Sequence, residues 1–187
     1  MITLIKNRVH GDARGWFTES YSAARLKALG LALDFVQDNH SFSARKGTLR
    51  GLHFQSPPFA QDKLVRCLRG RLLDVVVDLR RGSPSYGHWL SVELDARNHQ
   101  LLLVPKGFGH GFMTLEDDTE IFYKVTAPYA PAHDHGVRFD DPQIGITWPL
   151  PPDPASISPK DASLPLLKDL QSPFEYDGTA FELRSVE

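Results

Sequence analysis

Residues 63–79 read KLVRCLRGRLLDVVVDL, and this stretch decides the fold class. Apolar residues alternate with polar or charged ones on both sides of Gly70. After that glycine, the odd-numbered residues from Leu73 to Leu79 share one face, and the even-numbered residues from Asp74 to Asp78 share the other. A period of two residues is typical of β-strands, and a glycine between two such runs predicts a turn. We therefore expect two consecutive strands here.

Short runs of the same kind continue through the middle of the chain, from Asp34 to Ala127. The clearest of them are Lys63–Arg69, His88–Leu94, Gln100–Val104 and Glu120–Thr126, divided by turn formers such as Gly82-Ser83-Pro84 and Pro105-Lys106-Gly107. Short strands at regular spacing predict a mainly β protein, either a sandwich or a jelly-roll barrel. One short peripheral helix is expected at Ser22–Leu29, because Ser22 is a suitable N-cap and Gly30 a suitable end.

The length and the proline distribution predict a single domain over residues 1–187. A chain of 187 residues with 41% hydrophobic residues is long enough for one sizeable core and too short for two. Ten of the 14 prolines lie between Pro128 and Pro173, and prolines remove backbone donors that a central strand needs. We expect this Pro-rich segment to wrap the barrel rather than extend its core. The tail after Asp161 is expected to contribute packing rather than chemistry.

Composition argues against several classes of partner and location. The formal net charge is -2, from 21 basic and 23 acidic residues, so nothing indicates a nucleic-acid partner. The one cysteine, Cys67, lies in an apolar alternating run, which predicts a buried thiol and neither a disulfide nor a zinc site. The first residues form too short an apolar run for a signal peptide, and no run of about 18 apolar residues predicts a membrane span. We expect a cytoplasmic protein with no membrane partner.

Three residues could together carry out proton transfer at carbon. A histidine titrates near neutral pH, so His53 could take a proton from a carbon that lies next to a carbonyl. Alternation places Lys63 and Tyr123 on the apolar faces of their runs, where the ammonium could stabilise enolate charge and the phenol could donate a proton. Each residue also has a structural interpretation: a hydrogen-bonded histidine, a solvated lysine or a packed core tyrosine. The choice depends on which strand face is inside.

The residues from Pro105 to His110 have the form Pro-x-Gly-x-x-His, which resembles the second motif of the cupins. Metal-binding cupins have a His-x-His pair and a carboxylate in the first motif, whereas the corresponding residues here are His53-Phe54-Gln55. His53 and His110 alone would leave a transition metal with too few ligands. The sequence therefore predicts no bound metal. The structural alternative for His110 is a turn histidine bonded to backbone.

Taken in order, these segments resemble the dTDP-4-dehydrorhamnose 3,5-epimerase family from Gly11 to about Asp161. The blocks that carry the resemblance are Gly11–Gly15 with Phe17 and Glu19, Phe35–Ser41, Leu49–His53, Gln61–Arg66, Asp74-Val75 with Asp78, Gly107–Phe112, Tyr123-Lys124, Asp141-Pro142, Trp148-Pro149 and Lys160-Asp161. The resemblance implies a cupin-type double-stranded β-helix, which is a jelly-roll barrel, with a few short peripheral helices.

The resemblance also implies epimerisation at C3, C5 or both of a nucleotide-linked 4-keto-6-deoxy sugar, without a cofactor. Conversion of dTDP-4-dehydro-6-deoxy-D-glucose to dTDP-4-dehydro-L-rhamnose is the default. His53 would remove the proton beside the C4 ketone, Lys63 would stabilise the enolate, and Tyr123 would return a proton from the opposite face. Asp161 matches the carboxylate partner of the histidine, which fixes its tautomer and raises its basicity. On pattern alone, Ser158 to Asp161 is instead a capped helix start.

The resemblance also implies a larger set of substrate-binding residues. In this set, cations would neutralise the two phosphates, an aromatic ring would stack on the base, and side-chain amides would form hydrogen bonds with the edge of the base. The residues implied are Arg14, Glu19, Gln37, Asp38, Asn39, Arg50, His110, Tyr129, Asp134 and Lys160. Because part of the nucleotide site in this family comes from the partner subunit, the resemblance implies a homodimer with exchanged N-terminal strands. Surface solvation is the alternative for Arg14 and Glu19. Strict alternation separates Arg50 from His53, so we expect either a bulge at Gly51 or a separate pocket for Arg50.

Other functions stay open on the sequence alone. A single-centre epimerase or a keto-isomerase of an antibiotic deoxysugar pathway would use the same His, Lys and Tyr. A non-catalytic cupin that binds sugar nucleotides would keep the nucleotide contacts and lose turnover. A metal-dependent cupin isomerase or oxygenase is disfavoured, because Gln55 stands where a histidine ligand would be expected.

Overall fold

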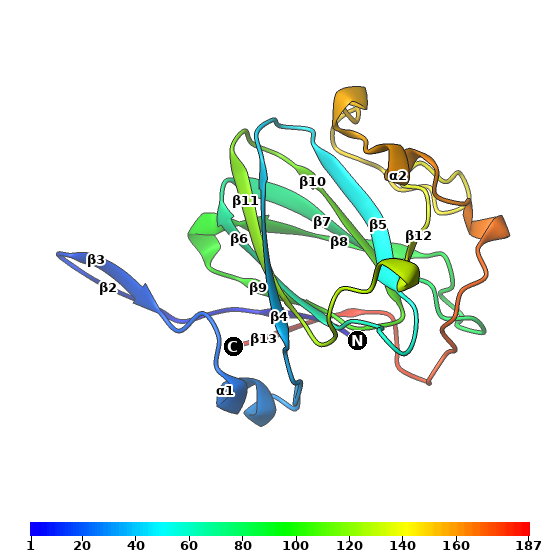
Figure 1. Cartoon of the computed structure of the whole chain (residues 1–187). Helices are drawn as coiled ribbons and strands as arrows, with labels where there is room; N and C mark the ends of the chain where they lie inside the picture. Colours follow the sequence, from blue (N-terminus) through cyan, green and yellow to red (C-terminus); the bar gives the residue numbers. More distant parts are fainter.

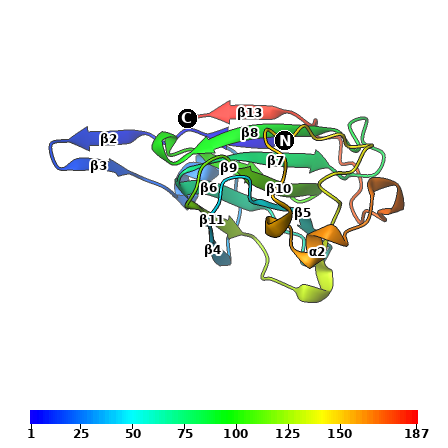
Figure 2. The same cartoon turned by 90° about the horizontal axis from the view of Figure 1, so that it is seen from above.

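The computed structural model describes all residues, 1–187, and its core is two β-sheets that face each other (Figures 1 and 2). The first sheet has six strands in the order β13, β1, β9, β6, β11, β4, with bounds Leu183–Val186, Ile2–Ile5, Leu101–Val104, Lys63–Arg69, Thr119–Val125 and Gln37–Ser43. The second has five strands in the order β12, β5, β10, β7, β8, with bounds Asp134–Gly136, Leu49–Gln55, Phe108–Thr114, Arg71–Asp78 and Trp89–Asp95. The four strands predicted above from their alternation are confirmed to within one residue at each end.

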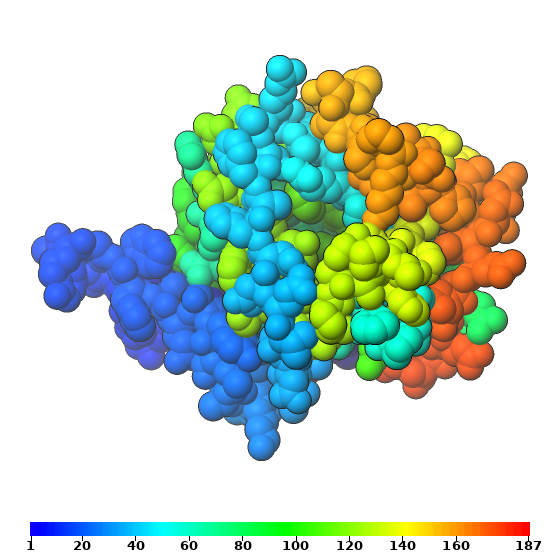
Figure 3. Space-filling model, viewed as in Figure 1, coloured from blue at the N-terminus to red at the C-terminus, as the bar shows by residue number.

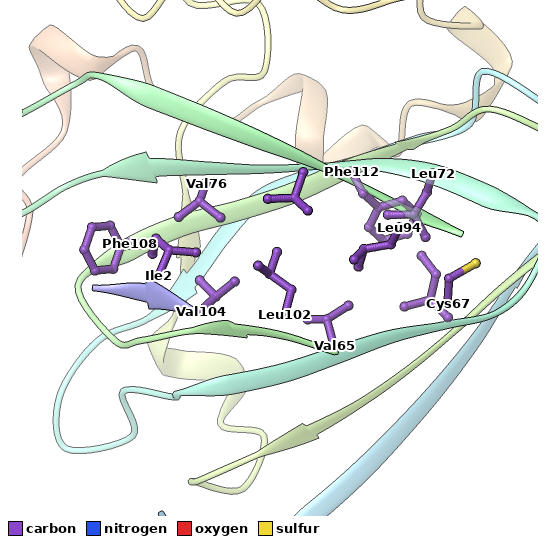
Figure 4. Close-up of a cluster of buried hydrophobic side chains, with 12 residues drawn as sticks. Ile2, Val65, Cys67, Leu72, Val76, Leu94, Leu102, Val104, Phe108 and Phe112 are labelled. Carbon is purple, nitrogen blue, oxygen red and sulfur yellow. The ribbon is translucent and has the colours of Figure 1, made fainter. Parts of the chain in front are cut away.

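The main apolar core fills the space between the two sheets (Figure 4). It contains Ile2, Val65, Cys67, Leu102, Val104 and Ile121 from the first sheet and Leu72, Val76, Val92, Leu94, Phe108 and Phe112 from the second. Cys67 is buried, as its alternating run predicts. The core includes side chains from strands that are remote in sequence, so both sheets must be assembled before it forms.

Strand β7 is buried on both faces. Val76 points into the core between the sheets, whereas Val75 and Val77 point the other way, into a second apolar cluster. This second cluster is completed by side chains from residues 137–174, the Pro-rich segment and the start of the tail. The segment contributes one short strand, β12, at the edge of the second sheet, and otherwise lies against the outer face. Because this segment covers the outer face of β7, the strand is buried on both faces, which accounts for its near-continuous apolar sequence.

Helix α1, Ala23–Ala28, confirms the helix that the sequence predicts at Ser22–Leu29. The Ser22 hydroxyl caps it by accepting a hydrogen bond from the Arg25 N–H at 3.2 Å. Gly30 follows with a φ of +80°, a conformation that glycine adopts without strain. The remaining helical pieces are short and peripheral: α2 at Pro159–Ala162 and single 3₁₀ turns at Ala96–Asn98, Pro131–His133, Pro154–Ser156 and Leu167–Asp169.

The C-terminal tail packs as expected, but it also adds a strand that the sequence did not predict. Phe174 is buried in the second cluster, and Phe181 stacks on Phe108 with ring centroids 5.6 Å apart. Beyond them, β13 pairs with β1 in parallel at the edge of the first sheet. Its residues are largely exposed, so alternation alone carried no signal for it.

A β-hairpin near the N-terminus projects away from the two sheets (Figures 1 and 3). It consists of β2, Val9–Asp12, and β3, Gly15–Thr18, which pair only with each other. Trp16 is 60% and Phe17 69% exposed, which is unusual for two large apolar side chains on one short hairpin. This hairpin is therefore the part of the chain that its own fold leaves least covered.

The chain contains no helix long and apolar enough to span a membrane.

Candidate active site

A cavity of about 280 Å³ lies between the sheets, next to the apolar core, whose Phe112 and Ile121 form part of its lining. Its lining brings together Arg50 and His53 from β5, His110 from β10, Lys63 from β6, Tyr123 from β11, and Lys160 and Asp161 from α2. Figure 3 shows a recess between β4, in light blue, and the orange residues that include α2. A larger cavity of about 530 Å³ shares Lys160 with this one but contains neither His53, Lys63 nor Tyr123. The smaller cavity is therefore the candidate active site.

His53 forms a short hydrogen bond with Asp161, with 2.6 Å between Nε2 and Oδ1. Asp161 is 3% exposed and also accepts a weaker bond at Oδ2 from the Gly51 N–H at 3.4 Å. Burial raises the pKa of Asp161, but the hydrogen bond from His53 and smaller contributions outweigh it, so the net pKa lies below its usual value. The ionised carboxylate holds the proton of His53 on Nε2 and leaves the lone pair on Nδ1.

The two interpretations of Asp161 both hold. Ser158 is the N-cap of α2, and its hydroxyl accepts a hydrogen bond from the Asp161 N–H at 3.0 Å. The Asp161 side chain points in the other direction, to His53. The cap therefore fixes the backbone from which the carboxylate reaches the histidine.

A bulge at Gly51 brings Arg50 and His53 to the same cavity, as expected from the conflict with strict alternation. In the pairing of β5 with β10, His53 lies opposite His110 while Arg50 lies opposite Phe112, so β5 contains one extra residue. Gly51 has a φ of +113°, and a Cβ there would lie 2.7 Å from the Cα of Gly111. Only glycine fits at this close approach.

Lys63 and Tyr123 face the histidines from the opposite sheet, on the inner side of β6 and β11. Burial lowers the pKa of Lys63 to about 8, although Asp134 and Asp74 oppose the shift. Burial also raises the pKa of Tyr123, and the Arg50 cation opposes that shift. Neither side chain bonds to another residue, so the ammonium and the phenol are free to contact a bound molecule.

His110 is held by a carboxylate that the sequence analysis did not assign to it. Its Nε2 lies 2.9 Å from both oxygens of Asp74, which is fully buried on β7. The signal was present in the sequence, since Asp74 interrupts an apolar run on the face that turns out to be inside. Two histidines on neighbouring strands of the second sheet thus line the cavity, and each of them is paired with an aspartate.

No group of three or more His, Cys, Asp or Glu side chains is placed to hold a metal ion. His53 and His110 each bond to a carboxylate. Gln55, at the position of the missing histidine, does not line the cavity and donates instead to the carbonyls of Phe59 and Pro128.

Four of the expected substrate contacts, Gln37, Asn39, Tyr129 and Asp134, do not line the cavity but connect to residues that do. Lys160 donates to Asp134 Oδ2, and the same oxygen accepts a hydrogen bond from the Tyr129 hydroxyl at 3.0 Å. Gln37 and Asn39 point to the inner side of β4, opposite Val125 and Tyr123. They bond to each other at 2.8 Å.

The structure does not bring the other three expected contacts to the cavity. Asp38 lies on the outer face of β4, where it forms an ion pair with Lys124 at 2.6 Å. The reason is the strand period of two residues, which separates Asp38 from its neighbours Gln37 and Asn39. Arg14 lies at the tip of the hairpin, where it bonds to Asp12, and Glu19 follows β3. Neither of them lines the cavity of its own protomer.

Comparison with known proteins gives consistent results. The family model described as dTDP-4-dehydrorhamnose 3,5-epimerase matches residues 2–169. The dTDP-4-dehydrorhamnose 3,5-epimerase of Sinorhizobium fredii is 53% identical over 175 residues, covering 94% of this chain and 89% of that protein.

Two solved structures share the fold. The first is the structure of dTDP-6-deoxy-D-glucose-3,5-epimerase RmlC from Legionella pneumophila in complex with dTDP-4-keto-L-rhamnose. It superimposes with a TM-score of 0.87 and 39% sequence identity, and the match covers 95% of this chain and 100% of that chain. That of ChmJ, a 3'-monoepimerase from Streptomyces bikiniensis in complex with dTDP-quinovose, has a TM-score of 0.81 and 36% identity, covering 88% and 83%. The predicted cupin-type jelly roll is confirmed. The chain belongs to the dTDP-4-dehydrorhamnose 3,5-epimerase family.

Proposed function

We propose that this chain epimerises dTDP-4-dehydro-6-deoxy-D-glucose at C3 and C5 and so produces dTDP-4-dehydro-L-rhamnose. The observation that carries the proposal is the position of His53 on one sheet and of Lys63 and Tyr123 on the other, all lining one cavity. A sugar ring bound between the sheets would have an imidazole on one face and a phenol on the other. Family membership supports the same substrate class.

The reaction begins when Nδ1 of His53 takes the proton from the carbon beside the C4 ketone. The C–H electron pair then forms the enolate double bond, and negative charge develops on the C4 oxygen. Asp161 stabilises the imidazolium, because its carboxylate accepts the hydrogen bond from Nε2. The ammonium of Lys63 stabilises the enolate oxygen in a site largely shielded from water.

Tyr123 completes the inversion by donating its phenol proton to the opposite face of the same carbon. The enolate double bond collapses back to the ketone as the new C–H bond forms. Exchange of protons with solvent then restores the neutral imidazole and the phenol. No electrons leave the substrate, so the chemistry requires no redox cofactor.

The nucleotide would bind across the mouth of the cavity. Arg50, His110 and Lys160 are suited to the two phosphates, because each can donate charge-assisted hydrogen bonds. Tyr129 offers an exposed ring for the base, while Gln37 and Asn39 offer amides for its edge. Asp134 accepts hydrogen bonds from Lys160 and Tyr129, and in this way links the phosphate and base subsites.

We propose that the active protein is a homodimer in which the hairpin of one protomer reaches the site of the other. The exposure of Trp16 and Phe17 supports this arrangement, because burying both in a partner would remove a large apolar area from water. Arg14 and Glu19 would then act on the partner's nucleotide. The same proposal treats residues 1–187 as one domain, supported by the packing of residues 137–174 on the outer face of the second sheet.

The test is the conversion of dTDP-4-keto-6-deoxyglucose in deuterated water, followed by NMR. Deuterium at both C3 and C5 of the product is the expected result. Substrate that binds but acquires no deuterium at either carbon would refute catalysis and leave a protein that only binds sugar nucleotides.

The second candidate is a single-centre epimerase. The monoepimerase ChmJ has the same fold at 36% identity, so the architecture is compatible with inversion of one carbon. The label position separates the two candidates, since a monoepimerase would introduce deuterium at one carbon only.

A further inference from the structure

We propose that Gln55 is a positioning residue that holds Tyr129 at the mouth of the cavity, and so governs the affinity for the nucleotide rather than the rate of proton transfer. This inference rests on the proposed function, in which the ring of Tyr129 takes the base. Gln55 itself is not among the residues that line the cavity.

The backbone on both sides of Tyr129 has no strand to pair with. It lies between the end of β11 at Val125 and the 3₁₀ turn at Pro131–His133. Pro128 and Pro131 have no N–H group, so this stretch cannot form a regular ladder of hydrogen bonds. Its carbonyls and the N–H groups that it does have must find other partners.

Side-chain amides provide those partners. The amide of Gln55 is almost completely buried, with 4% exposed. Its Oε1 accepts a hydrogen bond from the Ala130 N–H at 2.8 Å, and its Nε2 donates to the Pro128 carbonyl at 3.1 Å. These two contacts bracket Tyr129 from either side. A side-chain amide can do this because it carries a donor and an acceptor, like a peptide group.

Two further glutamines complete the support. Gln37 Oε1 accepts a hydrogen bond from the Tyr129 N–H at 3.0 Å, and Gln61 Nε2 donates to the Ala127 carbonyl at 2.8 Å. Gln37 is also an expected nucleotide contact, so its substitution would mix two effects. Gln55 is the better probe, because it supports the loop without facing the ligand.

The side chain of Tyr129 cannot hold its own position by packing. It is 57% exposed, and its phenol has one partner, Asp134 at 3.0 Å. The orientation of the ring therefore depends on the backbone that Gln55 brackets. If that bracket is lost, the ring must be ordered again when the nucleotide binds, which weakens binding.

The first test replaces Gln55 with methionine, which has a similar length but no amide. Calorimetric titration with dTDP should show binding weakened by roughly tenfold, the size expected when a buried bracket of this kind is lost. The KM for the sugar nucleotide should rise to a similar extent, while kcat stays within about twofold of wild type. Unchanged dTDP affinity, or a loss in kcat as large as the rise in KM, would overturn the proposal.

A double-mutant cycle shows whether the effect passes through the tyrosine. In a Tyr129→Ala background, Gln55→Met should weaken dTDP binding no further. An equal additional loss in that background would mean that Gln55 acts by another route. Gln143→Met is the matched control, because Gln143 is exposed and remote from the cavity lining, and it should bind dTDP like wild type.

A second variant keeps the proposal testable if Gln55→Met folds poorly. In Gln55→Glu, an ionised carboxylate would face the carbonyls of Phe59 and Pro128, whereas the protonated acid would again donate to one of them. Because burial raises the pKa of a carboxyl, dTDP binding relative to wild type should recover as pH falls from about 8 to about 6. If the ratio of the two dTDP affinities, Gln55→Glu to wild type, stays constant across this pH range, the proposed role of the Gln55 hydrogen bonds is wrong.

Binding and catalysis are measured separately throughout. If the wild-type protein introduces no deuterium, the proposed function is refuted. If Gln55→Met binds dTDP as tightly as wild type, only the proposed role of Gln55 is refuted.

Discussion

The proton-transfer groups and the nucleotide groups of this protein are held in different ways. His53, Lys63 and Tyr123 lie on β5, β6 and β11, and each of these strands has a neighbour on both sides. Tyr129 lies in a loop and Arg14 at the tip of a projecting hairpin. In the proposed function, the reacting geometry is thus built by the two sheets of one protomer, whereas the stacking ring for the base lies in a loop and Arg14 comes from the partner's hairpin. We expect defects in the first region to appear in kcat and defects in the second in KM.

The largest effect is expected for His53→Asn, which removes the general base. Turnover should fall by roughly 10⁴-fold, the upper range for loss of a general base. Affinity for dTDP should change little, because the histidine acts on the sugar ring. Steady-state kinetics and dTDP titration check both halves. Equal losses in both measurements would break the division between the two regions.

Lys63→Met should lower kcat by roughly 10³-fold, because the enolate loses its cationic partner. The folded-state pKa of Lys63 is about 8, below the usual 10.5, so its charge opposes folding at pH values below about 8, and this penalty is relieved as pH rises towards 10.5. The variant should therefore melt at a higher temperature than wild type at pH 7. A lower melting temperature would show that the ammonium stabilises the fold.

The same pKa predicts a pH profile for the wild-type protein. The ammonium of the free protein is lost as pH rises above about 8, so kcat/KM should decline there. Lys63→Arg, where active, should move that decline to higher pH because guanidinium stays protonated. An alkaline limb at the same pH in Lys63→Arg would assign it to another group.

Tyr123→Phe should lower inversion by roughly 10²-fold and leave part of the exchange reaction intact. His53 can still remove a proton and return a deuteron to the same face in deuterated water. NMR should therefore detect labelled substrate that has not been inverted. Loss of labelling together with inversion would mean that the phenol is also needed for deprotonation.

The smallest effect is expected for Arg14→Ala, which should raise KM by roughly tenfold with little change in kcat. Mixing this variant with His53→Asn subunits gives a sharper test of the hairpin exchange. In a mixed dimer, one site would combine an intact His53 with an intact Arg14 from the partner, and its KM should return to the wild-type value. If the KM does not recover on mixing, Arg14 acts on the active site of its own subunit, and the hairpin exchange is wrong.

Much of the fold was accessible from local pattern. Alternation gave β6, β8, β9 and β11 to within one residue at each end, and Ser22 and Gly30 marked the ends of α1. It gave no signal for β10, where the sequence suggested only a turn histidine at His110. The strand β13 was missed because its residues are mostly exposed and show no alternation of burial. Its place in the sheet comes from pairing with β1, at the other end of the chain.

The candidate site was accessible in part. His53, Lys63 and Tyr123 were recognised by residue type and family motif, and the structure brings them to one cavity. Asp74 and Gln55 were not given their roles, because each acts through a partner remote in sequence. Asp38 was included with Gln37 and Asn39 from the family resemblance, and the strand period turns it to the other face.

The sequence by itself determined several central strands and the chemical groups, because an alternating strand needs only a period of two and a functional group needs only its residue type. Tertiary structure decided which faces are inside, that Asp161 reaches His53 across 108 residues, and that a bulge at Gly51 brings Arg50 to the same cavity. These outcomes depend on closing long loops and on packing two sheets around one core. Local sequence patterns do not indicate which remote segments will meet or how their side chains will pack.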